Sequence, residues 1–309
     1  MPIQNDERYG KGVVAMSEEL VQLKDADQEF AQRIGLIVKK SLDSDDFQPP
    51  LLPEVALSLS ELANEPNVSF GKVEDVVKRD PVIAAKVVAV ANSAFYSRGT
   101  PVRSLRVAIT RLGLSEVRDV AFHVVAQTRV FRVKGYTDRM RVLFEAAQAS
   151  GIIARKICQI LRFESELAYL CGLLHDMGEA IILGIVGEAY RKEKGKVPPI
   201  ERLAQPIAAY HAAAGARVCS LWGLPEMIVD AVTCHHRPEE STNSSQMATV
   251  VAVADILLKH AGIGVQQKIV DPLREPLFYK LNLTPDQVAE LLEFAEFVAE
   301  NPDGSAISP

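Results

Sequence analysis

Apolar residues recur along this chain with the period of an α-helix. In the first such stretch, Leu20, Phe30, Ile34 and Ile37 fall at spacings that place them on one helical face. No stretch shows the sustained alternation of apolar and polar residues that is typical of a half-buried strand. The pattern therefore predicts an all-α fold, and a change in residue usage near position 140 predicts two lobes.

Capping residues, glycines and prolines mark the ends of the predicted helices. Thr284 followed by Gln287 has the pattern of a capping box, with proline at the first helical position. The predicted helix starts are Ser17, Asp80, Ser104, Ser115, Val142, Leu224 and Thr284, with stops at Gly113 and just before Pro238. The proline-rich residues 41–54 indicate a linker, and the last nine residues indicate a disordered tail.

Composition and charge exclude several classes of function. The chain has 309 residues and a formal net charge of −6, whereas nucleic-acid binders concentrate Lys and Arg. No apolar stretch reaches the roughly 18 residues of a membrane-spanning helix, and the N-terminus has no apolar signal core. Cys158, Cys171, Cys219 and Cys234 form no CxxC pair and are predicted to be buried, reduced thiols. We therefore expect a cytoplasmic protein without nucleic-acid or membrane partners.

Histidines and aspartates on apolar helix faces are the candidates for chemistry. Neutral imidazoles and carboxylates on four separate helices form a ligand set that Zn, Mn or Fe accepts. The candidate metal ligands are His175, Asp176, His211, His235, His236 and Asp255. Each has a simpler alternative, such as a core histidine at His211 or a solvated helix-end histidine at His236. No residue is assigned a catalytic role.

Asp255 is the most informative of these residues. Its neighbours Val251, Ala252 and Leu258 on the same helical face are apolar, so its carboxylate is expected to lean toward the core. A buried carboxylate needs a metal, a cation or hydrogen-bond donors. The next turn carries Lys259, which offers an ordinary helix ion pair. Metal ligand, hydrogen-bonded structural residue and exposed partner of Lys259 all remain open.

Several segments together resemble the HDOD (HD-related output domain) proteins of the HD superfamily. CGLLHDMGEAII is similar to the family's His-Asp motif, and the stretch from AAYHAAAG to CHHRPE is similar to the segment that follows it. VAVADIL resembles the terminal aspartate helix, and KRDPVIAAKVVAVANSAFYS resembles the first half of the domain. The resemblance covers about residues 50–260 and implies a helical, non-enzymatic signalling module.

Two departures from the HD phosphohydrolases bear on catalysis. Those enzymes carry a first histidine one helix before His-Asp, and Ala146 stands at that position here. Phosphodiesterases of the HD-GYP type carry a lysine shortly after His-Asp, where this chain has Glu179, a carboxylate expected to repel a phosphate. Both departures are expected to weaken hydrolysis by metal-activated water.

The resulting hypothesis is a non-catalytic bacterial output module that contacts other signalling proteins and has an HD-derived polar pocket, for which a bound divalent Fe, Mn or Zn ion and a metal-free pocket both remain open. The alternatives are a metal-dependent phosphohydrolase for the function and a homodimer for the assembly. The expected organisation is an N-terminal helical extension over 1–45, an HDOD N-terminal lobe over 50–140, an HD-like lobe over 141–265, and a C-terminal helix with its tail over 266–309.

Overall fold

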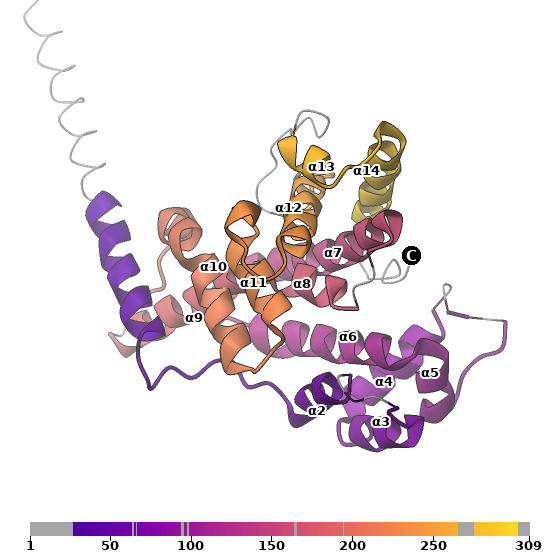
Figure 1. Cartoon of the computed structure of the whole chain (residues 1–309). Coiled ribbons are helices and arrows are strands. Elements are labelled where there is room, and N and C mark those ends of the chain that lie inside the picture. The colour runs from indigo at the N-terminus through magenta and orange to yellow at the C-terminus, as the bar shows by residue number, and fades with distance from the viewer. Residues whose placement is uncertain are drawn as a thin grey trace, which may run out of the picture.

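The computed structural model confirms the all-α prediction. It describes residues 27–63, 65, 67–93, 96–97, 99–163, 166–193, 195–264 and 275–301, and every regular element within them is a helix (Figure 1). Residues 27–42 form the first described helix. The others are α2 (Glu54–Leu62), α3 (Phe70–Val77), α4 (Pro81–Ala91), α5 (Leu105–Leu112), α6 (Leu114–Val125), η1 (Ala126–Val130), α7 (Thr137–Leu161), α8 (Ala168–Leu174), α9 (Met177–Lys192), η2 (Ile200–Leu203), α10 (Ala204–Leu221), α11 (Glu226–Cys234), η3 (Pro238–Glu240), α12 (Ser245–His260), α13 (Pro276–Lys280) and α14 (Pro285–Glu300).

Two of the predicted caps have the expected hydrogen bonds. The carboxylate of Asp80 accepts from the backbone N–H groups of Val82 and Ile83, at 2.9 and 3.1 Å, at the start of α4. The capping box of Thr284 and Gln287 is present at the start of α14. Both signals were readable because the cap and its backbone partners lie within three residues.

Other predicted boundaries were wrong. Gly113, at φ 81°, ends α5 and leads directly into α6, so that Ser115 lies inside the first turn of α6 instead of capping it. The Ser115 hydroxyl donates to Glu166 at 2.8 Å. The helix predicted from Val142 already begins at Thr137. The helix predicted from Leu224 runs from Glu226 to Cys234.

Some sequence predictions fall outside the described residues. They are the Ser17 cap, the first ten residues of the helix predicted over 17–40, and the tail after residue 301. The four cysteines lie within the described ranges, and all are buried free thiols.

The helices form two lobes, as predicted (Figure 1). In the first lobe α6 packs on α2 and α4, and α5 packs on α3 and α4. In the second lobe α7 packs on α8, α12 and α14, while α10 packs on α9 and α11. The chain passes from one lobe to the other between Val130 and Thr137.

The helix at residues 27–42 lies against the second lobe, beside α9 and α10 (Figure 1). Its Ile34 and Val38 side chains are fully buried. Arg33 donates to the Tyr190 hydroxyl at 2.7 Å, and Arg202 pairs with Asp27 at 2.9 Å. The segment between this helix and α2 therefore spans both lobes.

One apolar stretch of the chain is central to the second lobe. Residues Ala168–Lys192 are long and apolar enough to cross a membrane by length and composition, but 83% of their most apolar window is buried inside the fold. Burial of this kind is typical of a core helix in a soluble protein. The stretch consists of α8 and α9 with His175 and Asp176 between them.

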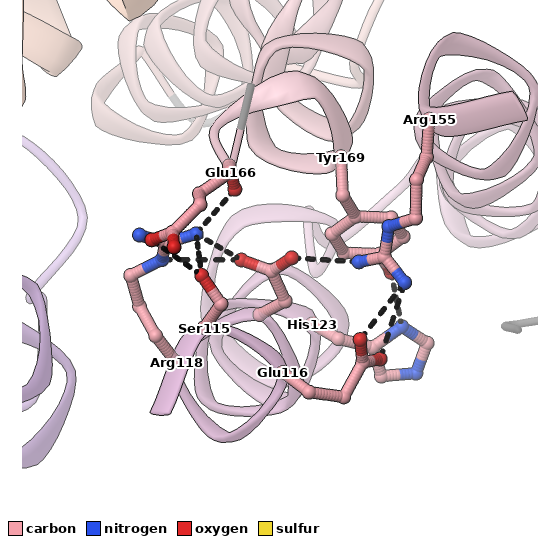
Figure 2. A network of polar contacts seen from close by, with 8 residues as sticks. Ser115, Glu116, Arg118, His123, Arg155, Glu166 and Tyr169 are labelled. Carbon is pink, nitrogen blue, oxygen red and sulfur yellow. Dashed lines mark hydrogen bonds and ion pairs between the residues drawn. The ribbon is translucent and has the colours of Figure 1, made fainter. Parts of the chain in front are cut away.

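A buried polar network joins α6 to α7 and α8 (Figure 2). The Arg155 guanidinium lies 3.0 Å from Glu116 and 2.7 Å from Asp119, and it stacks on the Tyr169 ring at 4.8 Å from the centroid. Arg118 pairs with the other oxygen of Asp119 at 3.0 Å. Each carboxylate of the network therefore has at least one guanidinium partner, which is what makes buried charges tolerable.

Candidate metal centre

Five helices of the second lobe bring all six predicted ligands together. His175 follows α8, Asp176 precedes α9, His211 lies within α10, His235 and His236 follow α11, and Asp255 lies within α12. Potential ligand atoms of Asp176, His211, His235 and His236 lie within 4.8 Å of one another, and so do those of His175, Asp176 and Asp255. The expected convergence is therefore present, with Asp176 common to both groups.

The junction of α8 and α9 explains how two adjacent residues serve one site. His175 is the C-cap of α8 and still has helical backbone angles, whereas Asp176 leaves the helical conformation at φ −103° and ψ 8° before α9 begins. Two residues later, a Cβ at Gly178 would lie 1.8 Å from the His211 carbonyl oxygen. Only glycine permits this approach of α9 to α10, which sets Asp176 against His211.

Backbone carbonyls fix the tautomer of three histidines. The Nδ1 atoms of His175, His211 and His235 lie 2.7, 2.9 and 2.8 Å from the carbonyl oxygens of Gly172, Ile207 and Val232. A carbonyl only accepts hydrogen bonds, so each Nδ1 carries the proton. In the neutral imidazole the Nε2 atom then presents a lone pair, which is the form that binds metals.

The Nε2 atoms of His211 and His235 lie 3.3 Å apart, and each presents a lone pair because its Nδ1 carries the proton. His236 Nε2 lies 2.8 Å from His211 Nε2 and can donate to it, because no carbonyl among the described residues fixes the tautomer of His236. Asp176 Oδ1 lies 3.5 Å from His211 Nε2 and 3.4 Å from His235 Nε2. Two lone pairs and a carboxylate oxygen at these distances repel unless a proton or a cation lies among them.

The spacing of these atoms fits one small metal ion. Ligands bound about 2.1 Å from a tetrahedral ion lie about 3.4 Å from one another. The triangle of Asp176 Oδ1, His211 Nε2 and His235 Nε2 has edges of 3.3 to 3.5 Å. The residues therefore fit a divalent transition metal in donor type, tautomer and spacing.

The charge state of Asp176 is also suited to binding a cation. Burial opposes the charged form of Asp176, but the neighbouring His175 and His235 outweigh it and hold the pKa of Asp176 well below its usual range. Burial likewise opposes protonation of His175, and the Asp176 and Asp255 carboxylates raise the pKa of His175 to about 9. An ionised Asp176 thus persists at neutral pH and can serve as a ligand.

His236 differs from the other histidines in its exposure. It lies at the surface end of the group, whereas His175, His211 and His235 are buried. Burial of the ring, with His235 and His211 beside it, lowers the pKa of His236 to about 4. A neutral His236 at physiological pH is compatible with a ligand role, although the sequence also allowed a protonated, solvated side chain.

A cavity of about 620 Å³ is lined by five of the six residues, all except His235. Its apolar wall includes Ala146 of α7, the position where the HD enzymes carry their first histidine. Glu179 also lines the cavity, but its carboxylate pairs with Arg139 at 2.5 Å. The expected repulsion of a phosphate by Glu179 is therefore offset by a guanidinium that the sequence analysis did not single out.

The comparison with protein families agrees with the resemblance read from the motifs. The HDOD domain model matches residues 50–238, more than half of the chain. The chain belongs to the HDOD family. The match ends at the first residue of η3, so α12 with Asp255 lies outside it.

Solved HDOD structures share this fold. An HDOD domain protein from Geobacter sulfurreducens is 23% identical, with a TM-score of 0.68 over 89% of this chain and 98% of that one. A protein from Shewanella amazonensis, provisionally named a metal-dependent phosphohydrolase, is 20% identical, with a TM-score of 0.66 over 88% and 98%. A protein from Marinobacter aquaeolei, provisionally named a signal transduction protein, is 25% identical, with a TM-score of 0.61 over 84% and 58%.

The curated relatives are long proteins, and the match with this chain covers only part of each of them. The chain spans 42% and 17% of the lengths of the two relatives it matches. Membership of the HDOD family is therefore established for the domain, and the activity of the whole protein is a matter of proposal.

Proposed function

We propose that this protein is an HDOD signalling module whose second lobe holds one divalent transition-metal ion as a structural and regulatory element. In this proposal the module acts through contacts with other signalling proteins and does not turn over a phosphoester efficiently. The observation that carries it is the pair of Nε2 lone pairs of His211 and His235, 3.3 Å apart, beside the carboxylate of Asp176.

The donor set selects the kind of ion. Imidazole nitrogen with carboxylate oxygen suits Zn, Fe and Mn. Asp176, His211, His235 and His236 would hold the ion, with His175 and Asp255 adjacent through the shared Asp176. When bound, such an ion adds folding free energy and can polarise a water molecule. The carbonyl partners of the Nδ1 atoms hold the imidazoles in the binding tautomer before the ion arrives.

Two observations support signalling over catalysis. The first is that Ala146, which lines the cavity, supplies no ligand where the HD enzymes carry a histidine. The name of the Marinobacter aquaeolei protein, which is 25% identical, supports a role in signal transduction. Partners, cytoplasmic location and a homodimeric state are parts of this proposal that only experiments on the protein can test.

Metal analysis of the purified protein tests the site. The wild type should retain about one ion per chain after dialysis, and His211→Ala should retain almost none. The matched control is His260→Ala, because His260 is an exposed histidine of the same lobe and lies outside both ligand groups. The proposal is wrong if the wild type holds no ion after loading with Zn²⁺, Fe²⁺ or Mn²⁺, or if His211→Ala holds as much as the wild type.

A metal-dependent phosphohydrolase is the second candidate. The observation that favours it is the cavity itself, which places Arg139 and Lys259 beside the ligand residues. A panel of cyclic dinucleotides, nucleotides and a generic phosphodiester, offered with Mn²⁺ or Fe²⁺, separates the two functions. We expect no turnover approaching the typical enzyme value of about 10 s⁻¹. Turnover near that rate, abolished by Asp176→Ala, would establish the enzyme instead.

A further inference from the structure

The two ligand groups of the pocket differ in what else contacts them. The first group consists of Asp176, His211, His235 and His236, and the second of His175, Asp176 and Asp255. Among the described residues, the ion-pair partners of Asp176 are all histidines. Asp255 instead has a lysine partner, which gives the second group a permanent cation that the first group lacks.

The lysine is Lys259, one turn after Asp255 on α12. Its Nζ atom lies 2.5 Å from Asp255 Oδ2. The two side chains are 27% and 16% exposed, and both line the cavity in front of the histidines. On an open helix surface such a pair would be weak, but here the ammonium sits where Asp255 would otherwise meet an ion.

In the second group, His175 has a nitrogen atom that could bind a metal and that makes no hydrogen bond among the described residues. Its Nε2 atom is buried and lies 3.3 Å from Asp176 Oδ2, yet it has no hydrogen-bond partner among the described residues. Its Nδ1 atom contacts the Gly172 carbonyl, as the Nδ1 atoms of His211 and His235 contact theirs. The second group therefore has an imidazole oriented as in a metal site, whose Nε2 proton an ion would displace, and a carboxylate, that of Asp255, which already has a cation partner.

We propose that Lys259 is a built-in cation that occupies the second group, so that the pocket binds one exogenous divalent ion instead of two. An ammonium and a divalent ion compete for the one carboxylate of Asp255, and they repel each other at close range. Lys259 thereby sets the metal stoichiometry of the pocket. This inference rests on the proposed function, because the first group must be the one that holds the exogenous ion.

The experiment counts Mn²⁺ ions in the full chain and in variants at Lys259. Lys259→Met removes the charge and keeps the apolar stem, while Lys259→Arg keeps the charge and is the matched control. Equilibrium dialysis against saturating Mn²⁺ gives the number of ions per chain. Electron paramagnetic resonance distinguishes an isolated Mn²⁺ from two coupled ions.

We expect one isolated Mn²⁺ in the wild type and in Lys259→Arg, and two coupled ions in Lys259→Met. Adding Asp255→Asn to Lys259→Met should return the count to one. Lys259→Gln serves as a second neutral variant if the Met variant fails to fold, which circular dichroism would reveal.

The outcomes separate this inference from the proposed function. Two ions in the wild type, or one ion in both neutral variants, would overturn the role of Lys259 and leave the first group intact. No ion in the wild type but one in Lys259→Met, lost again with Asp255→Asn, would support Lys259 as the resident cation and overturn the first group. No ion in any variant would overturn both.

Discussion

Two polar clusters of the described residues differ in how their buried charged and polar groups are matched. In the network between the lobes, the carboxylates of Glu116 and Asp119 both pair with Arg155 (Figure 2). In the pocket of the second lobe, two histidines turn their lone pairs toward each other and toward Asp176. The first cluster is complete by itself, whereas the second becomes complete when a cation joins it.

The difference teaches how a structural cluster can be told from a binding site. Both clusters are largely buried and both contain perturbed groups, so neither burial nor a pKa shift separates them. Burial raises the pKa of Glu116, for example, and the neighbouring guanidinium of Arg155 only partly offsets it. What separates the clusters is whether donors and acceptors match within the protein. The following changes test this distinction.

Removing the central cation of the network should have the largest effect. Arg155→Met leaves two buried carboxylates without this partner, and breaking a buried ion pair in this way costs about 3–5 kcal/mol. The free energy of unfolding in urea measures the loss. Arg141→Met on the same helix is the control, because its pair with Glu145 is 66% and 36% exposed and is expected to contribute under about 1 kcal/mol. Equal losses in the two variants would mean that the network is not the lobe contact we describe.

Separating α9 from α10 should cause the second-largest loss of stability and should also lower the metal content of the pocket. Gly178→Ala places a Cβ against the His211 carbonyl, with backbone on both sides, and overpacking of this kind costs about 3 kcal/mol at the upper end of its range. The metal content should fall as well, because Asp176 and His211 move apart. Gly184→Ala on the same helix meets no atom within 4 Å and should be neutral or slightly stabilising. Unchanged stability and metal content in Gly178→Ala would show that the close approach is dispensable.

Adding an ion should stabilise the pocket cluster and leave the network cluster unaffected. At a metal concentration of one hundred times Kd, binding adds about 2.7 kcal/mol to the free energy of unfolding. Urea unfolding of the wild type, first stripped of metal with a chelator and then measured with and without Mn²⁺, gives this gain. His211→Ala should lose the gain, whereas Arg141→Met should keep it in full. A similar gain in His211→Ala would place the ion elsewhere.

Local signals made most of the fold and part of the site predictable. Capping patterns and helical periodicity act over a few residues, so α4 and α14 were predicted with their caps. The turn at His175 and Asp176 and the small residues around His211 were also readable from the sequence. The start of α7 was missed because its N-cap is Tyr136, which makes no side-chain capping bond. Arg139 therefore lay outside the predicted helix, and its pairing with Glu179 was not foreseen.

Contacts between distant segments were beyond the reach of one sequence. Glu116, Asp119 and His123 recur at helical spacing on one face of α6, which could have indicated a shared polar surface. Arg155, the partner of Glu116 and Asp119, lies on another helix, and its sequence neighbours give no indication of the pairing. For Asp255 the sequence left the metal and the lysine as alternatives. The structure places the carboxylate against Lys259 and beside the histidines at once.

The smallest expected effect concerns the histidine of the network. Burial, with the charge of Lys86, lowers the pKa of His123 to about 3, and His123 Nδ1 lies 3.2 Å from the Tyr169 hydroxyl. In the unfolded chain a histidine has a pKa near 6.5, so between these values the unfolded state binds the extra proton and acid favours unfolding. From pH 7 to pH 5 this linkage should remove about 2 kcal/mol of stability from the wild type.

His123→Gln cannot take up that proton and keeps a polar partner for Tyr169, so its stability should fall by about 2 kcal/mol less over the same range. Urea unfolding of both proteins at pH 7, 6 and 5 gives the difference directly. His175 in the pocket has a pKa raised to about 9 and is already protonated in the folded state across this range. Its proton linkage therefore raises the stability as the pH falls, and it does so equally in both proteins. Identical pH dependence in the two proteins would show that His123 titrates normally in the folded state, and that the network is open to water and protons as the pocket is.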